Sequence, residues 1–181
     1  MSRNIAAFLL FFYVFIPNAA ESQLMGLDDI HEDIQSKYTE VSHLNADEFS
    51  GLPSSEIIVF DVREEKEYGV SRLSDAIQVS PDINADDFIA QFGEQLSGKT
   101  AVFYCSVGRR SSDLVSRLEA NPQTGEEAAL FNLEGGLFGW VNEQREVDGV
   151  GIHPYNWFWG QLLIEDKTMI NYTPIEETDN D

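Results

Sequence analysis

The only cysteine of the chain, Cys105, lies where a thiol can do chemistry. It directly follows the apolar run 100–104, which is typical of a strand buried on both faces. A helix is predicted to begin near residue 111, a few positions later. In a parallel α/β sheet, ligands collect outside the carboxyl ends of strands, in the loops that lead into the next helix. The loop at this place reads Ser106-Val107-Gly108-Arg109-Arg110, followed by Ser111 and Ser112.

The residue types of this loop favour a negatively charged sulfur. Gly108 permits backbone angles that other residues resist, so several main-chain N–H groups can point at one atom. A helix N-terminus and nearby arginines lower a cysteine pKa from about 8.5 into the range of about 3.5–7.5. This setting favours a Cys105 thiolate and, equally, an anionic persulfide. A cysteine buried as a small hydrophobe is the alternative, but such a residue needs no glycine, arginines and serines after it.

Strands and helices are predicted to alternate along the chain. The strands are apolar throughout, which indicates a parallel sheet with helices on both faces. Asn45 and Glu48 form a capping-box pattern at the start of a short helix. The periodicity predicts strands over 41–44, 57–60, 76–79, 100–104 and 128–133, and helices over 27–37, 45–51, 86–96, 111–120 and 137–144.

Three motifs in this chain resemble those of a known family, the single-domain rhodaneses. The loop from Tyr104 to Ser112 is similar to the active-site loop of that family. Phe60 to Tyr68 resembles its opening signature, and Asn132 to Trp140 resembles its closing Gly-Gly-x-x-x-Trp element. The resemblance implies an α/β, rhodanese-like fold over residues 41–149, with a central five-stranded parallel sheet and helices on both faces.

The resemblance also implies a sulfurtransferase. Cys105 would attack a donor such as thiosulfate or a persulfide, carry the sulfur as a persulfide, and pass it to cyanide or a thiol. Arg110 would hold the anionic donor, with Arg109 sharing that task, and both arginines are expected to face solvent. No cofactor and no metal are implied. The active-site loop that would bind the persulfide, mainly through backbone donors, comprises Ser106, Val107, Gly108, Arg109, Arg110 and Ser111.

Two further residues of the opening signature are candidates for a supporting role. Asp61 and Arg63 follow the second strand, and they either take part in catalysis or brace the turn beneath the active-site loop; we favour the brace. Two positions depart from the family pattern, Arg72 replacing a usual histidine and Asp75 a usual glycine. That stretch is chiefly structural in the family, so we expect the local loop shape to change more than the chemistry.

Two other functions compete with sulfur transfer. Related dual-specificity phosphatases have five residues between cysteine and arginine, whereas four separate Cys105 from Arg110. The smaller ring suits one sulfur atom better than phosphate, although the sequence alone leaves phosphate or arsenate hydrolysis open. The second alternative is a non-catalytic or redox-sensing rhodanese-like module, for which a residue other than cysteine at position 105 would have been the sign.

The N-terminal residues 1–20 have the layout of a signal peptide. Arg3 precedes the apolar run 5–16, and Pro17 and small residues follow. Cleavage after Ala20 or Ser22 would release an exported protein, periplasmic or secreted; an uncleaved segment would instead anchor it to a membrane. The net charge of −21 repels nucleic acid and anionic lipid, so neither is expected as a partner.

The segments flanking the expected domain carry no chemical motif. Residues 21–40 form a helical lead-in, which we expect to pack on the core rather than bind a partner. Residues 150–181 form an aromatic C-terminal extension with an acidic tail. Its aromatic part, 150–160, is either a hydrophobic cover or a binding platform, and a cover is the commoner outcome. His153 has no ligand-like partners in the sequence, so no metal site is indicated.

Overall fold

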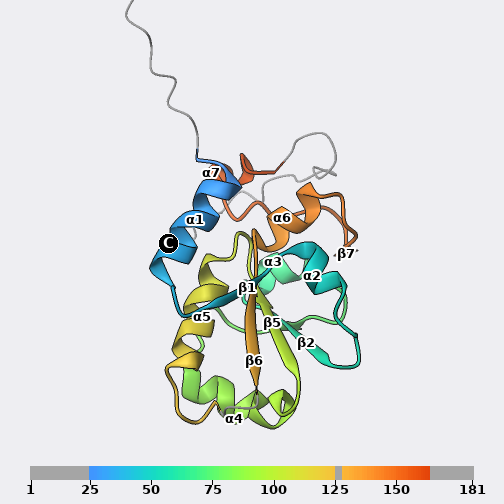
Figure 1. Ribbon diagram of the computed structural model, residues 1–181. Helices are drawn as coiled ribbons and strands as arrows, with labels where there is room; N and C mark the ends of the chain where they lie inside the picture. Colours follow the sequence, from blue (N-terminus) through green and yellow to red (C-terminus); the bar gives the residue numbers. More distant parts are fainter. Residues whose placement is uncertain (1–24, 125–127, 164–181) are drawn as a thin grey trace, which may run out of the picture.

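A five-stranded parallel sheet forms the centre of the molecule, as predicted (Figure 1). The computed structural model describes residues 25–124 and 128–163 of the 181-residue chain. Within these ranges the strands lie in the order β1-β6-β5-β2-β4, so the predicted short strand near residue 42 is at one edge. The strands are β1 (Ser42–Leu44), β2 (Ile57–Asp61), β4 (Ile77–Gln78), β5 (Thr100–Tyr104) and β6 (Ala129–Leu133).

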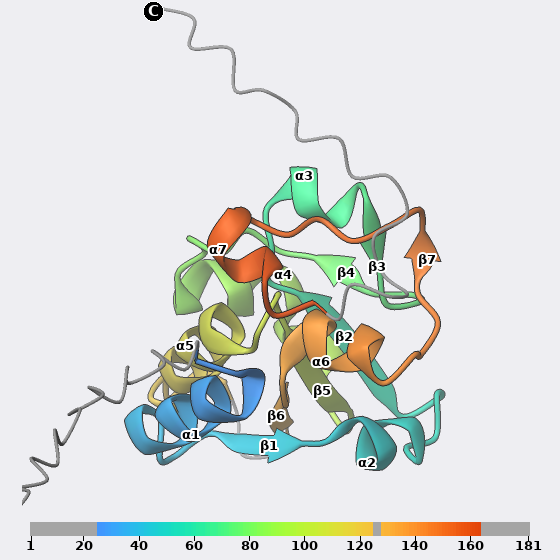
Figure 2. The same cartoon turned by 90° about the horizontal axis from the view of Figure 1, so that it is seen from above.

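Helices cover both faces of the sheet (Figures 1 and 2). α1, α4 and α5 lie on one side, and α2 and α6 lie on the other. The bounds of these five helices agree with the predicted ranges to within two residues at each end. The helices are α1 (Leu27–Lys37), α2 (Ala46–Ser50), α3 (Glu65–Tyr68), α4 (Ala85–Leu96), α5 (Arg109–Glu119), α6 (Gly136–Asn142) and α7 (Trp157–Gly160).

The core lies between β2, β5 and α4, where four phenylalanine rings pack together. Phe60 stacks on Phe103 across neighbouring strands, with ring centroids 5.0 Å apart. Phe88 and Phe92 of α4 meet Phe60 edge-on at 5.0 and 5.2 Å. These rings cover one face of β2 and β5, and helices on the other side of the sheet cover the second face. Burial on both faces is why the strands lack the alternating pattern of a half-exposed sheet. The strand register then pairs Asp61 with Tyr104, directly before Cys105.

Four short elements have no counterpart in the predictions. β3 (Ser71–Arg72) and β7 (Asp148–Gly149) form a two-stranded antiparallel ribbon outside the main sheet. α3 and α7 each comprise four residues. Asp75, at the position of the usual family glycine, has φ of +59°. Aspartate tolerates this left-handed conformation better than most residues do, so the backbone angle at this position is one that glycine also adopts freely.

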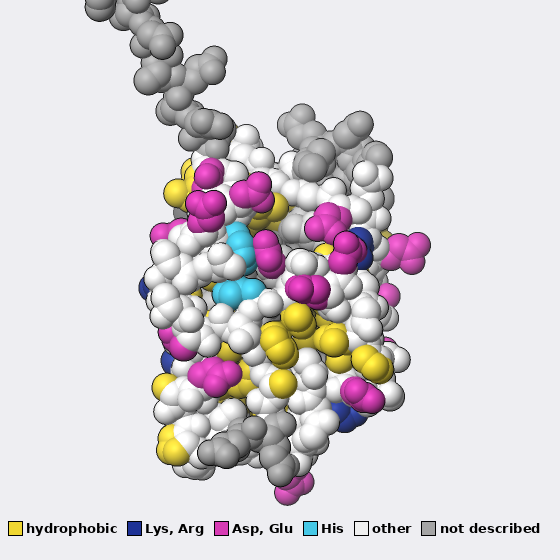
Figure 3. Space-filling view, viewed as in Figure 1, with side chains coloured by type: hydrophobic (Ala, Val, Ile, Leu, Met, Phe, Trp, Pro, Cys, Tyr) yellow, Lys and Arg dark blue, Asp and Glu magenta, His cyan; other side chains and the backbone are white. Residues whose placement is uncertain are grey.

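The ends of the chain lie outside the described residues. The predicted signal peptide over 1–20 and the acidic tail are therefore expectations that the structure does not address. None of the helices in the described ranges is both long enough and apolar enough to cross a membrane. Acidic side chains are spread over the face seen in Figure 3, in keeping with the net charge of −21.

Candidate active site

Cys105 lies at the carboxyl end of β5, directly before the loop that enters α5. Its side chain is buried, with 1 % of the residue exposed, yet it lines a pocket. Gly108 is the N-cap of α5 and has φ of +92°, a conformation that favours glycine. The turn at Gly108 aims the N–H groups of Val107 and Ser111 at the Cys105 sulfur. The predicted loop is thus a ring around the thiol.

The surroundings of Cys105 favour its thiolate. Burial raises the pKa of this thiol, but the Arg110 guanidinium and hydrogen bonds from Ser111 and Val107 lower it by more. The pKa therefore lies below the ordinary value of 9.0. The N-terminus of α5 adds partial positive charge in the same direction. The loop therefore favours the charged form of Cys105, which is the form in which a cysteine acts as a nucleophile.

Arg110 is held by a buried carboxylate. Its Nη1 and Nη2 donate to Glu67 Oε2 and Oε1, both at 2.8 Å, and Nη2 lies 3.1 Å from the Ser106 hydroxyl oxygen. Ser106 Oγ donates to Glu67 Oε1 at 2.8 Å. Burial raises the pKa of Glu67, but the pairing with Arg110 lowers it by more. Glu67 is fully buried while the Arg110 side chain is one quarter exposed, so Arg110 faces solvent only in part.

Arg109 points away from Glu67, to the lead-in helix. Its Nη2 forms an ion pair with Asp33 Oδ2 of α1 at 2.7 Å, and both side chains are substantially exposed. Ile30 and Ile34 of α1 are buried, so α1 packs on the core as expected. The helix has a second role that the sequence did not show, because it supplies the carboxylate partner of one loop arginine.

A polar chain lies behind the sulfur on the β6 side. Ser111 Oγ donates to Asn132 Oδ1 at 2.6 Å, and Asn132 Nδ2 lies 3.1 Å from His43 Nδ1. Burial, together with the neighbouring His31, lowers the pKa of His43 to about 4, so the ring is neutral at pH 7. The Ser111 hydroxyl has one proton, which it gives either to Asn132 or to the thiolate. Asn132 therefore positions Ser111.

The start of α6 fixes the other side of the loop. The N–H groups of Leu137 and Phe138 donate to the carbonyls of Cys105 and Ser106 at 2.8 and 2.9 Å. Gly136 has φ of +57°, and a Cβ on it would collide with the carbonyl oxygen of Cys105. This close approach explains the paired glycines of the closing motif in physical terms.

Asp61 and Arg63 brace the turn behind the site. Both are fully buried, and Arg63 Nε and Nη2 donate to the two oxygens of Asp61 at 2.8 and 2.6 Å. Arg63 Nη2 also donates to the Ser71 carbonyl, and the Tyr104 hydroxyl donates to Asp61 Oδ2, each at 2.6 Å. Neither charged residue lines the Cys105 pocket. This arrangement supports the predicted brace.

Two aromatic residues from the extension close the Cys105 pocket, which has a volume of about 190 Å³. In Figure 2, α7 lies over the end of the sheet at which β5 enters α5. Ile152 and His153 are buried, whereas Trp157 is 79 % exposed, so only part of the segment forms a hydrophobic cover. The pocket lining comprises Cys105, Ser106, Val107, Arg109, Arg110, Tyr155 and Trp159.

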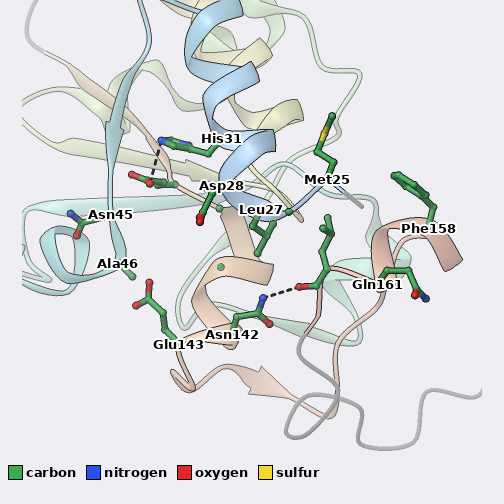
Figure 4. A pocket seen from close by; sticks show the side chains of 15 residues that line it. Met25, Leu27, Asp28, His31, Asn45, Ala46, Asn142, Glu143, Phe158 and Gln161 are labelled. Carbon is green, nitrogen blue, oxygen red and sulfur yellow. Dashed lines mark hydrogen bonds and ion pairs between the residues drawn. The ribbon is translucent and has the colours of Figure 1, made fainter. Parts of the chain in front are cut away.

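A larger hollow of about 470 Å³ lies between α1, α2, α6 and α7 (Figure 4). It is lined by the acidic residues Asp28, Glu134 and Glu143, and His31 pairs with Glu134 at 3.3 Å. Cys105 does not reach it. Because the smaller pocket contains the Cys105 thiol, whose pKa is lowered, it is the candidate active site.

Comparison with known families decides which family this geometry represents. The family model of the Rhodanese-like domain matches residues 45–143, more than half of the chain. The chain belongs to the rhodanese-like family. The matched range of the rhodanese-like domain contains Cys105, its loop, Glu67 and Asn132. It leaves out α1, which supplies Asp33, and the whole extension from residue 150.

Several solved structures are similar to this rhodanese-like domain. A thiosulfate sulfurtransferase from Pseudomonas aeruginosa is 16% identical to this chain, and the two structures superpose with a TM-score of 0.50. The match covers 71% of this chain and 24% of that protein. The chain thus spans about a quarter of that protein. A rhodanese-related protein from Thermoplasma volcanium is 21% identical, with a TM-score of 0.46 and coverage of 59% and 96%. A Rhodanese-like domain protein from Staphylococcus aureus is 25% identical, with a TM-score of 0.45 and coverage of 59% and 97%. A search of curated proteins found no match.

Sequence reasoning missed four residues at the site of this rhodanese-like domain. Glu67 and Asn132 stood inside recognised motifs, but nothing in their spacing showed that they face the loop. Tyr155 and Trp159 stood in an aromatic segment for which two placements were open. A glutamate on the same helical turn as other acids gives no signal of burial, so only the fold identifies it.

Proposed function

We propose that this protein is a sulfurtransferase that carries a sulfane sulfur on Cys105. The observation that carries the proposal is the ring of donors around a thiol whose pKa is lowered. A thiolate attacks the outer sulfur of a donor, and the same N–H groups of Val107 and Ser111 then hold the anionic persulfide. Thiosulfate or a persulfide is the proposed donor, and cyanide or a thiol the acceptor. We further propose that the protein works after export, as residues 1–20 suggest.

The residues of the site divide the work. Cys105 is the nucleophile and forms a new S–S bond as the donor's S–S bond breaks. Arg110 stabilises the anionic sulfur, as its charge lowers the Cys105 pKa. Glu67 positions Arg110, and Ser111 supports the sulfur with its N–H and hydroxyl. The family membership and the fold shared with a protein named thiosulfate sulfurtransferase support this assignment.

The test is turnover of thiosulfate and cyanide to thiocyanate. We expect activity in the native protein and none in Cys105→Ser, whose side chain is nearly the same size. Ser36→Ala serves as the matched control, because Ser36 lies on the exposed side of α1 far along the sequence from the loop. Absence of turnover in folded native protein, with every donor and acceptor pair tried, would favour the non-catalytic module instead.

A further inference from the structure

The Cys105 pocket is completed from outside the rhodanese-like domain. Tyr155 and Trp159 line it together with the loop, although both lie beyond the matched range 45–143. The other lining residues come from the sulfur-binding loop itself. The extension therefore supplies the walls against which the non-sulfur part of a donor must pack.

The part of the extension that the structure describes, residues 150–163, is tied to the domain at both of its ends. At its start, β7 pairs with β3, and Val150 N–H donates to the Val70 carbonyl at 3.0 Å. At its end, Asn142 Nδ2 of α6 donates to the Leu162 carbonyl at 2.8 Å, which is the bond drawn from Asn142 in Figure 4. Leu163 is buried. The aromatic walls are therefore held in place before a ligand binds, which reduces the entropy lost on binding.

Tyr155 is fixed against the loop by its own backbone. Its φ is +65°, an unfavourable conformation for an aromatic residue, and its N–H donates to the Nδ1 of the buried His153 at 3.0 Å. The Arg110 guanidinium carbon lies 4.9 Å from the Tyr155 ring centroid, a cation–π contact. Strained residues of this kind persist where the surrounding contacts determine them, and they gather at ligand sites.

The charges around the pocket disfavour a dianion. Arg110 is paired with Glu67, and Arg109 with Asp33, so each guanidinium already has a carboxylate partner. An adjacent hollow of about 450 Å³ shares Arg110 and Tyr155 as walls and is lined on its other sides mainly by acidic and polar residues. Its carboxylates belong to Glu64, Glu65 and Asp82. With Cys105 as a thiolate, these carboxylates add to the repulsion of a second negative charge on the donor.

We propose that Tyr155 and Trp159 are specificity-determining residues, and that the site prefers small monoanionic sulfane donors carrying an apolar or aromatic group over dianionic thiosulfate. This inference rests on the proposed function. The pocket of about 190 Å³ has room for such a group, since a cavity of about 150 Å³ accepts benzene. The apolar group packs on the two aromatic rings while the outer sulfur faces Cys105.

The transfer step balances without an oxidant. For a thiosulfonate, R–SO₂–S⁻, the Cys105 thiolate attacks the outer sulfur and forms a new S–S bond. The bond between that sulfur and the sulfonyl sulfur breaks, and its electron pair leaves with the sulfinate R–SO₂⁻. The products are Cys105–S–S⁻ and the sulfinate, with the same total charge as the reactants. Cyanide then removes the outer sulfur as thiocyanate and restores the thiolate.

The experiment compares benzenethiosulfonate, methanethiosulfonate and thiosulfate as donors, with cyanide as acceptor. The measured quantity is the ratio of kcat/KM for benzenethiosulfonate to that for thiosulfate, so intrinsic donor reactivity cancels between variants. We expect Trp159→Ala to lower this ratio roughly tenfold, the effect of about 1.4 kcal/mol of lost ring contact. Trp157→Ala is the matched control, because Trp157 lies on the same helix, is 79 % exposed and does not line the pocket.

A second arm tests the charge preference. Screening by salt relieves repulsion between like charges, so kcat/KM for thiosulfate should rise with ionic strength more than that for methanethiosulfonate. A fall for thiosulfate would show net attraction and overturn the charge preference.

A second variant covers the case in which Trp159→Ala does not fold. Tyr155→Ala is then compared by the same ratio of kcat/KM for benzenethiosulfonate to that for thiosulfate, since Tyr155 is 41 % exposed and also lines the pocket.

The failures of the two proposals are distinguishable. An unchanged donor ratio in Trp159→Ala and Tyr155→Ala, with Cys105-dependent thiosulfate turnover intact, overturns the aromatic wall and leaves the sulfurtransferase standing. Absence of persulfide from all three donors in folded native protein defeats the sulfurtransferase, and the inference falls with it.

Discussion

Arg110 and the buried Glu67 form a two-point ion pair in which each guanidinium nitrogen lies 2.8 Å from its own carboxylate oxygen. The pair joins α5, which contains Arg110, to α3, which contains Glu67 and follows β2. The charge of Arg110 also lowers the Cys105 pKa. One guanidinium thus serves both the fold and the thiolate.

Removal of Arg110 should therefore destabilise the fold as well as the site. Arg110→Ala leaves Glu67 buried without a counter-charge, and we expect a loss of about 2–3 kcal/mol, less than for a fully buried pair because Arg110 is partly exposed. Arg109→Ala, whose partner Asp33 is exposed, should cost less than about 1 kcal/mol. Urea unfolding measures both, and the double change Arg110→Ala with Glu67→Gln should recover part of the loss. Equal stability of the two single variants would refute the structural role of the pair.

Thiol reactivity should report the lowered Cys105 pKa. The folded pKa lies below 9.0, so ionisation of Cys105 contributes stability that is fully present above the unfolded pKa and is lost as pH falls through the folded one. The rate of iodoacetamide alkylation, followed from acid to alkaline pH, should have a lower pH midpoint in the folded protein than in the protein unfolded in urea. The midpoint should move upward in Arg110→Ala and in Ser111→Ala. A folded midpoint at or above that of the unfolded protein would contradict the lowered pKa.

Arg63 should prove structural rather than catalytic. Arg63→Met leaves Asp61 buried and unpaired, and we expect a loss of about 3–5 kcal/mol in the free energy of unfolding. Cys105 alkylation in the folded fraction should keep its native pH midpoint, since Arg63 does not line the pocket. A stable Arg63→Met protein with a shifted midpoint would assign Arg63 to the chemistry instead.

Gly136 should be irreplaceable because of contact as well as backbone angle. An alanine there pays the left-handed cost of about 1–2 kcal/mol and also collides with the Cys105 carbonyl. Gly98 is the matched control, because its φ is +68° and a Cβ on it meets nothing within 4 Å. Gly136→Ala should be clearly less stable than Gly98→Ala in thermal unfolding and should change the Cys105 midpoint. Equal destabilisation would mean that α6 does not hold the loop.

The central sheet and the helices that cover it could be predicted because their patterns are local. The apolar run before Cys105 and the periodic residues of α1 each contain their own signal. The β3–β7 ribbon could not be predicted, since two-residue strands carry no periodicity. Its register pairs Ser71 with Gly149 and Arg72 with Asp148, so the two strands are more than 70 positions apart in the sequence.

The site was predictable at Cys105 and its loop but not at its partners. Cys105, Gly108 and Arg110 lie within six residues of one another, so the sequence alone indicates that they form one loop around the thiol. Glu67, Asn132 and Tyr155 reach the loop only through tertiary packing, and no spacing connects them to it. Glu67, the partner of Arg110, lies 43 positions away in the sequence. The sequence therefore did not show that Arg110 is paired, and the arginine was expected to face solvent.

The most direct measurement is the intact mass of the desalted protein after exposure to a sulfane donor. The account predicts that native protein gains the mass of one sulfur atom, located on Cys105, and loses it again on addition of cyanide, while Cys105→Ser gains nothing. An unchanged mass in folded native protein with thiosulfate and with both thiosulfonates, or an equal gain in Cys105→Ser, would contradict it.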